Sequence, residues 1–272
     1  MLVTRRRALG ALAAGGAGLL GAGGYGVLVE RHRLGVTRAT ISLRRLPPGL
    51  DGLRVGLATD FHYGRFTGDE MVAAVAQRLA EERLDLVLLG GDFVTWSDRA
   101  AVAPCAAALA GVRARLGVFA VFGNHDPEGT VKAVFERRGV GVLRDQHTRL
   151  DVRGEPVALA GLRYWSSRPA DLDRALRGSR GFPILLAHDP RRVDLAAAAA
   201  VPLVLSGHTH GGQVVVPGLG APAAARYPVV HGLGRRGGTA LFVSRGIGTV
   251  VVPVRFNCPP EVVILTLRTA RT

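Results

Sequence analysis

Apolar residues along the chain fall into short runs separated by amphipathic segments, a pattern that predicts alternating strands and helices. Runs at residues 54–59, 86–89 and 118–122 predict three strands, because short apolar runs suit a buried sheet. Residues 69–84 and 98–110, which lie between these runs, have the spacing of helices. Strands that alternate with helices over short connections indicate parallel pairing in an α/β sheet.

The pattern becomes rich in strands after Gly139. Strands are predicted at residues 140–143, 157–160, 184–187, 203–206, 241–244 and 262–267, with helical segments near 169–176 and 191–199. We therefore expect two sheets packed face to face with helices outside. A chain of 272 residues is long enough for one large α/β domain, and its sequence contains no Pro- or Ser-rich linker that would divide it.

The amino-terminal segment has the layout of an export signal. Three arginines at positions 5–7 precede an uncharged run over residues 8–29 that is rich in Ala, Gly and Leu. The paired arginines resemble the twin-arginine signal, which exports folded proteins. The run is also long enough for a membrane anchor. No clear A-x-A cleavage site stands out, so release and retention are both open.

These features predict the organisation and location of the chain. Residues 1–29 form an export signal or membrane anchor, residues 30–52 a linker and lead-in, and residues 53–272 the folded domain. We expect export across the cytoplasmic membrane by the twin-arginine route, and a membrane-anchored, cell-envelope or extracellular location. The protein is expected to be a monomer that associates with the membrane through its amino terminus.

The net charge of +14 is concentrated near the amino terminus. Residues 1–50 carry eight arginines and one glutamate, a balance of +7 and therefore half of the excess. Arginine suits the recognition of phosphate, but arginine-rich codon usage produces the same composition. The charge alone does not indicate nucleic acid as the partner.

The two cysteines, Cys105 and Cys258, are not arranged as a CxxC pair. This spacing favours neither a thiolate metal site nor a disulfide scaffold. We expect two buried free thiols.

Polar side chains with metal-binding chemistry follow at least five of the predicted strands. Because ligands of open α/β sheets bind at the carboxyl ends of strands, we expect these side chains to meet at one edge. They offer carboxylate, amide and imidazole groups without sulfur, a set that suits Mn, Fe or Zn. Asp92 has two oxygens and can bridge two cations. The candidate ligands are Asp60, His62, Asp92, Asn124, His188, His208 and His210.

The same motifs resemble the five signature blocks of the calcineurin-like metallophosphoesterase family. The blocks are Asp60-Phe-His62, Gly91-Asp92, Gly123-Asn124-His125-Asp126, Ala187-His188 and Gly207-His208-Thr209-His210, in the family's order. The resemblance implies a four-layer α/β/β/α sandwich of two mixed sheets, with a dinuclear metal site at the carboxyl ends of the strands. It implies two divalent or trivalent ions (Mn, Fe or Zn) and no organic cofactor.

The resemblance also implies a role for each residue of the site. Asp60, His62, Asp92 and His210 would hold one ion, while Asp92, Asn124, His188 and His208 would hold the other. A hydroxide bridging the two ions would attack the phosphoester. His125 would be a non-ligand histidine that donates a proton to the leaving group. Asp126 either orients His125 or is a turn residue that caps the following helix.

The carboxyl-terminal part of the chain carries a hint about the substrate. Gly211-Gly212-Gln213, Ser244-Arg245-Gly246-x-Gly248 and Pro253-x-Arg255 resemble a bacterial branch typified by twin-arginine-exported phosphodiesterases. The resemblance favours an exported phosphodiesterase or pyrophosphatase that acts on lipid- or envelope-linked phosphates. Arg245 and Arg255 either clamp a second phosphate or are solvated surface residues.

Two other functions are open at this level. A nuclease or a broad phosphomonoesterase would use the same metal site, although few aromatic residues are available to stack on nucleic acid. A non-catalytic, metal-stabilised binding module would be expected to have lost ligands, and no ligand is missing from this sequence. The aromatic residues Phe61, Tyr63, Phe66 and Trp96 either form an apolar rim for an acyl chain or pack the loops.

Overall fold

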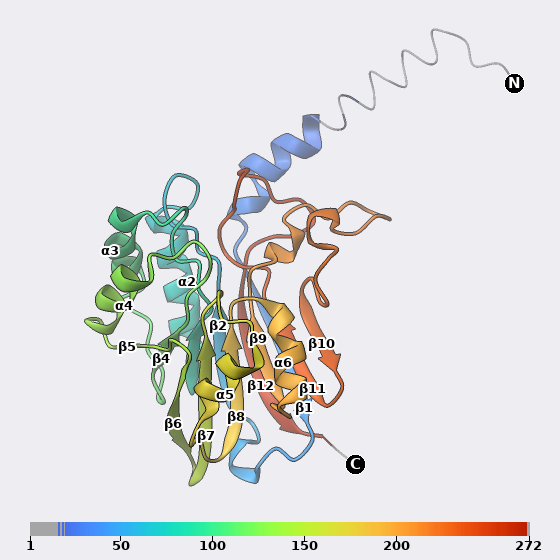
Figure 1. Ribbon diagram of the computed structural model, residues 1–272. Coiled ribbons are helices and arrows are strands. Elements are labelled where there is room, and N and C mark those ends of the chain that lie inside the picture. Colours follow the sequence, from blue (N-terminus) through green and yellow to red (C-terminus); the bar gives the residue numbers. More distant parts are fainter. Residues whose placement is uncertain (1–15, 17, 19, 271–272) are drawn as a thin grey trace, which may run out of the picture.

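The fold consists of two six-stranded sheets packed face to face, with helices on both outer surfaces. The computed structural model describes residues 20–270 together with residues 16 and 18. The first sheet has the order β1-β12-β2-β3-β4-β5, and the second has the order β10-β11-β9-β8-β7-β6. Both are mixed: β12 runs antiparallel to β2, and β10 and β6 run antiparallel to their neighbours (Figure 1). The predicted four-layer sandwich is confirmed.

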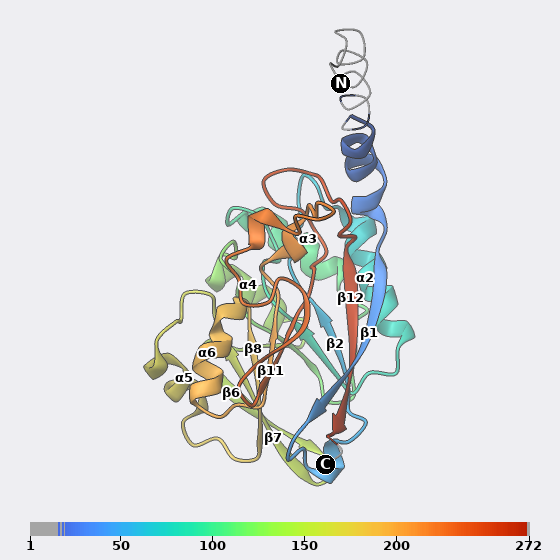
Figure 2. The same ribbon diagram turned by 90° about the vertical axis from the view of Figure 1, so that its right-hand side faces the viewer.

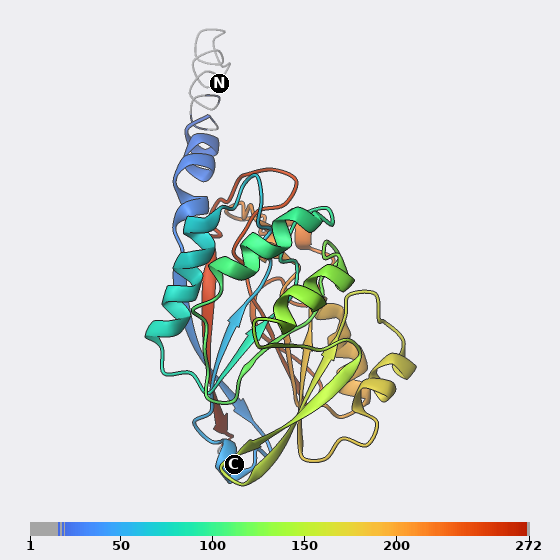
Figure 3. The same cartoon turned by 90° about the vertical axis from the view of Figure 1, so that its left-hand side faces the viewer.

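The first sheet is formed mainly by the amino-terminal half of the chain. Its strands are β1 (Gly35–Leu43), β2 (Arg54–Ala58), β3 (Leu86–Leu89), β4 (Val118–Ala120), β5 (Val140–Val142) and β12 (Glu261–Thr269). Helices α2 (Asp69–Glu81), α3 (Arg99–Ala108) and α4 (Glu128–Glu136) cover its outer face (Figure 3). Val72, Val102 and Phe135 of these helices pack against Val87 and Leu89 of the sheet.

The second sheet continues the chain order. It consists of β6 (Gln146–Val152), β7 (Glu155–Leu162), β8 (Phe182–Ala187), β9 (Leu203–Ser206), β10 (Gly232–Arg236) and β11 (Thr239–Val243). Helices α5 (Pro169–Leu176) and α6 (Val193–Ala198) cover its outer face. Short 3-10 turns occur at Glu30–His32, Pro48–Leu50, Pro190–Arg192, His210–Gly212 and Pro222–Ala224. The helical segment predicted near 191–199 is therefore a 3-10 turn followed by α6.

The principal core lies between the sheets. Leu57 and Leu88 of the first sheet meet Leu159, Leu186 and Phe242 of the second, and all five side chains are almost fully buried. Along β2, Leu57 faces this core while Ala58 faces the helices. The alternation of successive side chains to opposite faces explains why strands buried on both sides read as continuous apolar runs.

Residues 35–43 form an edge strand of the first sheet, although we predicted them to be part of a linker and lead-in over residues 30–52. β1 pairs in parallel with β12 over its whole length, from Gly35 opposite Glu261 to Leu43 opposite Thr269 (Figure 2). Ile41 and Leu43 are buried between the sheets. The pattern did not predict this strand because its remaining residues are polar or partly exposed, as expected at a sheet edge.

Candidate metal centre

All seven predicted ligands lie together where strands of both sheets end. Three loops of the first sheet, following β2, β3 and β4, supply four of them, and two loops of the second sheet, following β8 and β9, supply the other three. The carboxyl ends of parallel strands share one edge of each sheet, so the packing of the two sheets brings the two edges together. The predicted ligands are Asp60, His62, Asp92 and Asn124 from the first sheet, and His188, His208 and His210 from the second.

Asp92 lies between two groups of imidazoles. Its Oδ2 atom is 3.5 Å from Nε2 of His62 and 3.2 Å from Nε2 of His188. On one side, Asp60, His62 and His210 offer ligand atoms within 4.8 Å of one another, and on the other side Asp92, His188 and His208 do so. The arrangement provides two adjacent clusters of oxygen and nitrogen atoms with a carboxylate between them.

Pairs of histidine nitrogens face each other in these clusters. Nε2 of His62 lies 3.1 Å from Nε2 of His210, and Nδ1 of His208 lies 3.2 Å from Nε2 of His188. Within the described part of the chain, the buried Oδ1 of Asn124 has no hydrogen-bond partner. A buried oxygen normally has a partner, and carboxylate, amide and imidazole groups bind Mn, Fe or Zn. The donor set therefore fits metal ions.

The outward ring nitrogens of three histidines contact residues that orient them. Nδ1 of His188 donates to the carbonyl oxygen of Gly90 at 2.7 Å, and Nε2 of His208 lies 2.8 Å from the hydroxyl of Tyr227. Nδ1 of His62 lies 3.2 Å from Oγ1 of Thr95. Metal-binding histidines usually have such partners, which fix the ring orientation. Tyr227 and Thr95 belong to no motif, so sequence reasoning missed them.

Burial and the charge of Asp92 have opposite effects on the pKa values of the histidines. Burial lowers the pKa of His62 to about 4, that of His208 to about 3, and that of His210 well below its usual value. Burial also acts to lower the pKa of His188, but the negative charge of Asp92 and a hydrogen bond to it outweigh this effect and raise the pKa to about 10. Neutral imidazole is the form that binds metal, and metal binding displaces protons from such ligands.

The loops hold the ligands in unusual backbone conformations. Asp60, His62, Asp92, His208 and His210 all have φ between 45° and 73°. This left-handed region costs a non-glycine residue about 1–3 kcal/mol and is concentrated at functional sites. Two neighbouring glycines allow the close packing. A Cβ atom on Gly123 would lie 2.0 Å from Oδ1 of Asp92, and one on Gly207 would lie 2.3 Å from Oδ2 of Asp60.

His125 lies at the edge of the cluster, against a solvent-facing cavity of about 470 Å³. Trp96 and Trp165, with relative exposures of 72% and 64%, line the same cavity. The backbone N–H of Trp96 donates to Nδ1 of His125 at 3.2 Å. A neutral imidazole that accepts at Nδ1 carries its proton on Nε2. Burial lowers the pKa of His125 and favours this neutral form.

Asp126 has a different role from either one expected. Its carboxylate accepts hydrogen bonds of 2.8 Å from the backbone N–H groups of Asp92, Phe93 and Gly123. It therefore connects the loop after β3 to the loop after β4. The expectation that Asp126 orients His125 is wrong, because the ring of His125 accepts its hydrogen bond from the backbone of Trp96. The expected helix cap is also wrong, since α4 begins after Pro127 without a side-chain cap.

Arg245 and Arg255 are structural residues, so both interpretations of them are wrong. Arg255 is fully buried, and its guanidinium donates to the carbonyl oxygens of Gly248, Cys258 and Arg245. Arg245 forms a salt bridge of 2.6 Å with the buried carboxylate of Glu261. Neither guanidinium is free to clamp a phosphate.

The four aromatic residues predicted as a possible apolar rim differ in their burial. Phe61 is fully buried and stacks on Phe93 at a centroid distance of 5.6 Å, so it packs the core. The hydroxyl of Tyr63 donates to Asp69. Trp96 is the most exposed of the four predicted rim residues. These four side chains therefore do not form a continuous apolar rim.

Cys105 and Cys258 are buried free thiols, as expected. The thiol of Cys105 donates to the carbonyl oxygen of Phe93, in the loop that follows β3. The thiol of Cys258 donates to the carbonyl oxygen of His210 at 3.2 Å. Both cysteines support the loops of the site without contributing a ligand.

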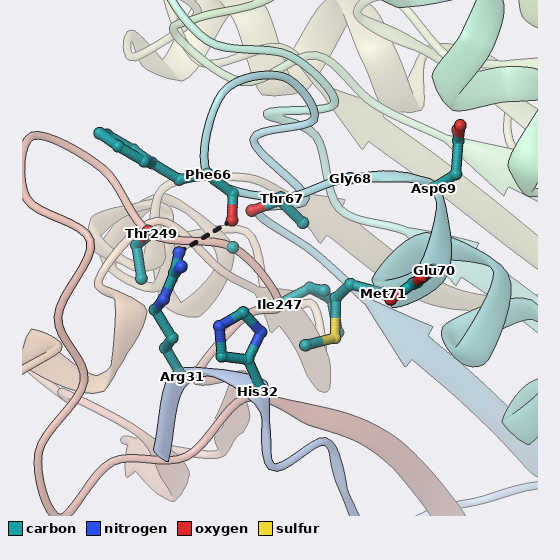
Figure 4. A pocket seen from close by; sticks show the side chains of 11 residues that line it. Arg31, His32, Phe66, Thr67, Gly68, Asp69, Glu70, Met71, Ile247 and Thr249 are labelled. Atoms are coloured by element: carbon teal, nitrogen blue, oxygen red, sulfur yellow. Dashed lines mark hydrogen bonds between the residues drawn. The ribbon is translucent and has the colours of Figure 1, made fainter. Parts of the chain in front are cut away.

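The segment before β1 packs against residues 255–258, which precede β12. Residues 20–28 are helical, and the carbonyl oxygen of Gly26 accepts from the backbone N–H of Arg255 at 3.2 Å. Arg31 donates to the carbonyl oxygen of Phe66 across a cavity of about 370 Å³, to which His32 and Met71 also contribute (Figure 4). This cavity is lined by none of the seven predicted ligands. Among the residues described, no helix combines the length and apolarity needed to cross a membrane.

Comparison with known proteins identifies the family. Residues 53–212 match the profile of the calcineurin-like phosphoesterases. The chain is 32% identical to the uncharacterized metallophosphoesterase YkuE of Bacillus subtilis, over 95% of this chain and 94% of that protein. It is 32% identical to the phosphodiesterase YaeI of Escherichia coli, over 76% and 79% of the two chains. A transmembrane protein with metallophosphoesterase domain from Danio rerio is 30% identical over 90% of this chain and 60% of its own length.

The chain belongs to the calcineurin-like phosphoesterase family. The protein is a metallophosphoesterase, an enzyme that hydrolyses phosphoric esters, and the clustered Asp, Asn and His side chains are its candidate metal site.

Proposed function

We propose that the protein is a phosphodiesterase that works with two metal ions held on either side of Asp92. The supporting observation is the position of the Asp92 carboxylate, 3.5 Å from Nε2 of His62 and 3.2 Å from Nε2 of His188. Asp60, His62 and His210 complete one site with it. Asn124, His188 and His208 complete the other. When bound, the two cations supply an acidified water as nucleophile and neutralise the phosphate charge.

The chain's own residues then have three tasks. The buried ligands, together with Asp126 beneath them, hold the two sites in a fixed geometry. His125 presents the proton of Nε2 to the oxygen that leaves the phosphorus, because its Nδ1 is occupied by the N–H of Trp96. The cavity beside His125 receives the group that leaves, between Trp96 and Trp165. General acid catalysis of this kind contributes about 10²–10⁴-fold to the rate.

The proposed substrates are diesters or pyrophosphates linked to lipids or to the cell envelope. The Escherichia coli relative is named a phosphodiesterase, which supports diesters, and the Danio rerio relative is named a transmembrane protein, which supports a membrane setting. The arginines at positions 5–7, ahead of an uncharged run, support export by the twin-arginine route. Residues 1–15 lie outside the described part of the chain.

A substrate panel with defined metal content tests this proposal. The purified protein is loaded separately with Mn, Fe or Zn and assayed on a simple diester, the matching monoester, a nucleotide-sugar lipid and single-stranded DNA. We expect about two ions per chain, and a higher kcat/KM for the diester or the lipid than for the monoester. One ion per active chain contradicts the two-metal proposal, and preference for the monoester or the DNA contradicts the proposed substrate class.

A further inference from the structure

An apolar groove adjoins the candidate metal centre, because two of the predicted ligands line it. Its volume is about 620 Å³, and it lies between residues 212–227 and the loop of residues 250–252. His208 and His210 line it, while the rest of its wall is mostly aliphatic: Val214, Val216, Ala223, Ala224 and Val250–Val252. This volume is within the range of roughly 300–1,000 Å³ that is usual for small-molecule sites.

Most polar groups in the groove wall are hydrogen-bonded within the protein, either to one another or to neighbouring backbone, and Arg226 is an exposed charged residue of that wall. The hydroxyl of Thr209 donates to the carbonyl oxygen of Val230 at 2.6 Å. The side chain of Gln213 accepts from the backbone N–H of Val250 at 2.6 Å and donates to the carbonyl oxygen of Val252 at 3.4 Å. The hydroxyl of Tyr227 contacts His208 and also accepts from Arg226. The groove therefore presents mainly hydrocarbon to a ligand.

Apolar side chains are exposed at the mouth of the groove. Val251 and Val252 have relative exposures of 74% and 48%. The same loop continues to Arg255, which is bonded to the helical segment of residues 20–28, where Leu20 and Leu28 are also exposed (Figure 1). Clustered exposed apolar residues mark surfaces that meet an apolar partner. The groove thus opens at the end of the molecule that carries the apolar amino-terminal segment.

We propose that this groove binds the hydrocarbon chain of an amphiphilic phosphoester while the phosphate lies at the metal centre. The proposal rests on the proposed function, and it assigns the hydrocarbon chain of the substrate to Val214, Val216 and Val250–Val252. The predicted aromatic rim is not needed for this task, because aliphatic walls beside His208 and His210 provide the apolar surface.

A series of substrates that differ only in chain length tests the proposal. Methyl, butyl and octyl 4-nitrophenyl phosphate diesters share one scissile bond and are used below their critical micelle concentrations. Full burial of a methylene group is worth about 0.8 kcal/mol, or about fourfold in kcat/KM. We expect kcat/KM to rise by about two- to fourfold per methylene until the groove is filled.

Binding is measured in parallel, so that the groove and the reaction are tested separately. The dissociation constants of methyl-, butyl- and octylphosphonate for the metal-loaded protein are determined by calorimetry. We expect the octyl compound to bind at least about tenfold more tightly than the methyl compound. If the octyl preference appears in binding while no diester is hydrolysed, the groove is supported and the proposed function is contradicted. If diesters are hydrolysed but neither kcat/KM nor binding depends on chain length, the groove proposal is overturned.

A double variant locates the effect. V251D together with V252D places two charges at the mouth of the groove, at exposed positions where folding tolerates them. We expect the octyl-to-methyl ratios of kcat/KM and of affinity to fall towards one. L233D is the matched control, because Leu233 is 45% exposed on β10 and lies outside the groove. Equal ratios in the double variant and the wild type would place the hydrocarbon chain elsewhere and overturn the proposal.

Discussion

The backbone N–H of His125 donates a 2.8 Å hydrogen bond to Oδ1 of Asp92, while Oδ2 of the same carboxylate faces His62 and His188. One carboxylate therefore sets the main-chain position of the proposed proton donor and lies between the two groups of candidate ligands. The side chains of Asp92 and His125 have separate proposed tasks. Substitutions can distinguish them, because one task requires metal and the other requires a proton.

Substitution of Asp92 is expected to remove metal. In D92N a neutral amide replaces the carboxylate between the clusters, so we expect fewer than about two ions per chain. Loss of one ion removes several kcal/mol of charge stabilisation, which corresponds to a fall in kcat/KM of at least about 10²–10³. Elemental analysis and kinetics on purified protein measure both effects. D173N is the control, since Asp173 is exposed on α5, and full metal content in D92N would contradict its role as a shared ligand.

Substitution of His125 is expected to slow the reaction without removing metal. We expect H125A to lower kcat by about 10²–10⁴ for a diester with an alkyl leaving group, which requires a proton as the bond breaks. A 4-nitrophenyl leaving group departs as a stable anion and needs no proton. We therefore expect H125A to lower kcat much less for a diester with this leaving group. Assays with leaving groups of graded pKa measure this trend.

Metal content decides between two roles for His125. His125 also lies within 4.8 Å of ligand atoms of His62 and Asp92, so the geometry admits it as a ligand. H208A is the comparison, and it is expected to lose metal and activity for every leaving group. H231A, which changes an exposed histidine that belongs to neither group of candidate ligands, is the neutral control. A loss of metal from H125A would indicate that His125 is a ligand, and a loss of rate that does not depend on the leaving group would contradict its role as proton donor.

Removal of the buried carboxylate of Glu30 is expected to destabilise the fold. Glu30 is 4% exposed, and its Oε1 accepts a hydrogen bond from the backbone N–H of Cys258. In E30A this buried N–H loses its partner, which costs about 1–3 kcal/mol of unfolding free energy. For a chain of this size, each kcal/mol lowers Tm by about 2–4 °C. Calorimetry of E30A beside E70A, which changes an exposed glutamate, measures the difference.

The paired arginines before the uncharged run are expected to direct export. Replacing Arg5 and Arg6 with lysine preserves the charge but is expected to block the twin-arginine route. Fractionation of cells that express the two forms at equal levels measures the location of each. Export that continues unchanged would favour the general secretory route or simple membrane insertion.

The clustering of the candidate ligands could be predicted from local features. Apolar runs predicted β2, β3, β8 and β9, and each of these strands is followed by polar residues at the edge where ligands bind. The buried strands and the motifs that follow them are adjacent in sequence, so a short window of residues contains both. Their roles as metal ligands stay predictions until metal content is measured.

Contacts between distant parts of the chain decided the rest. β1 became part of the first sheet through its pairing with β12, more than 200 residues later. Asp126, Arg245 and Arg255 could not be interpreted from their neighbours, because partners that define their roles are backbone groups and a carboxylate 10 to 34 residues away in the sequence. The valines of the groove likewise resemble ordinary apolar segments in the sequence. Local pattern therefore determined most of the strands, the motifs and the likeness to the family. Burial and hydrogen bonding across the two sheets determined which charged residues are structural and where an apolar surface adjoins the site.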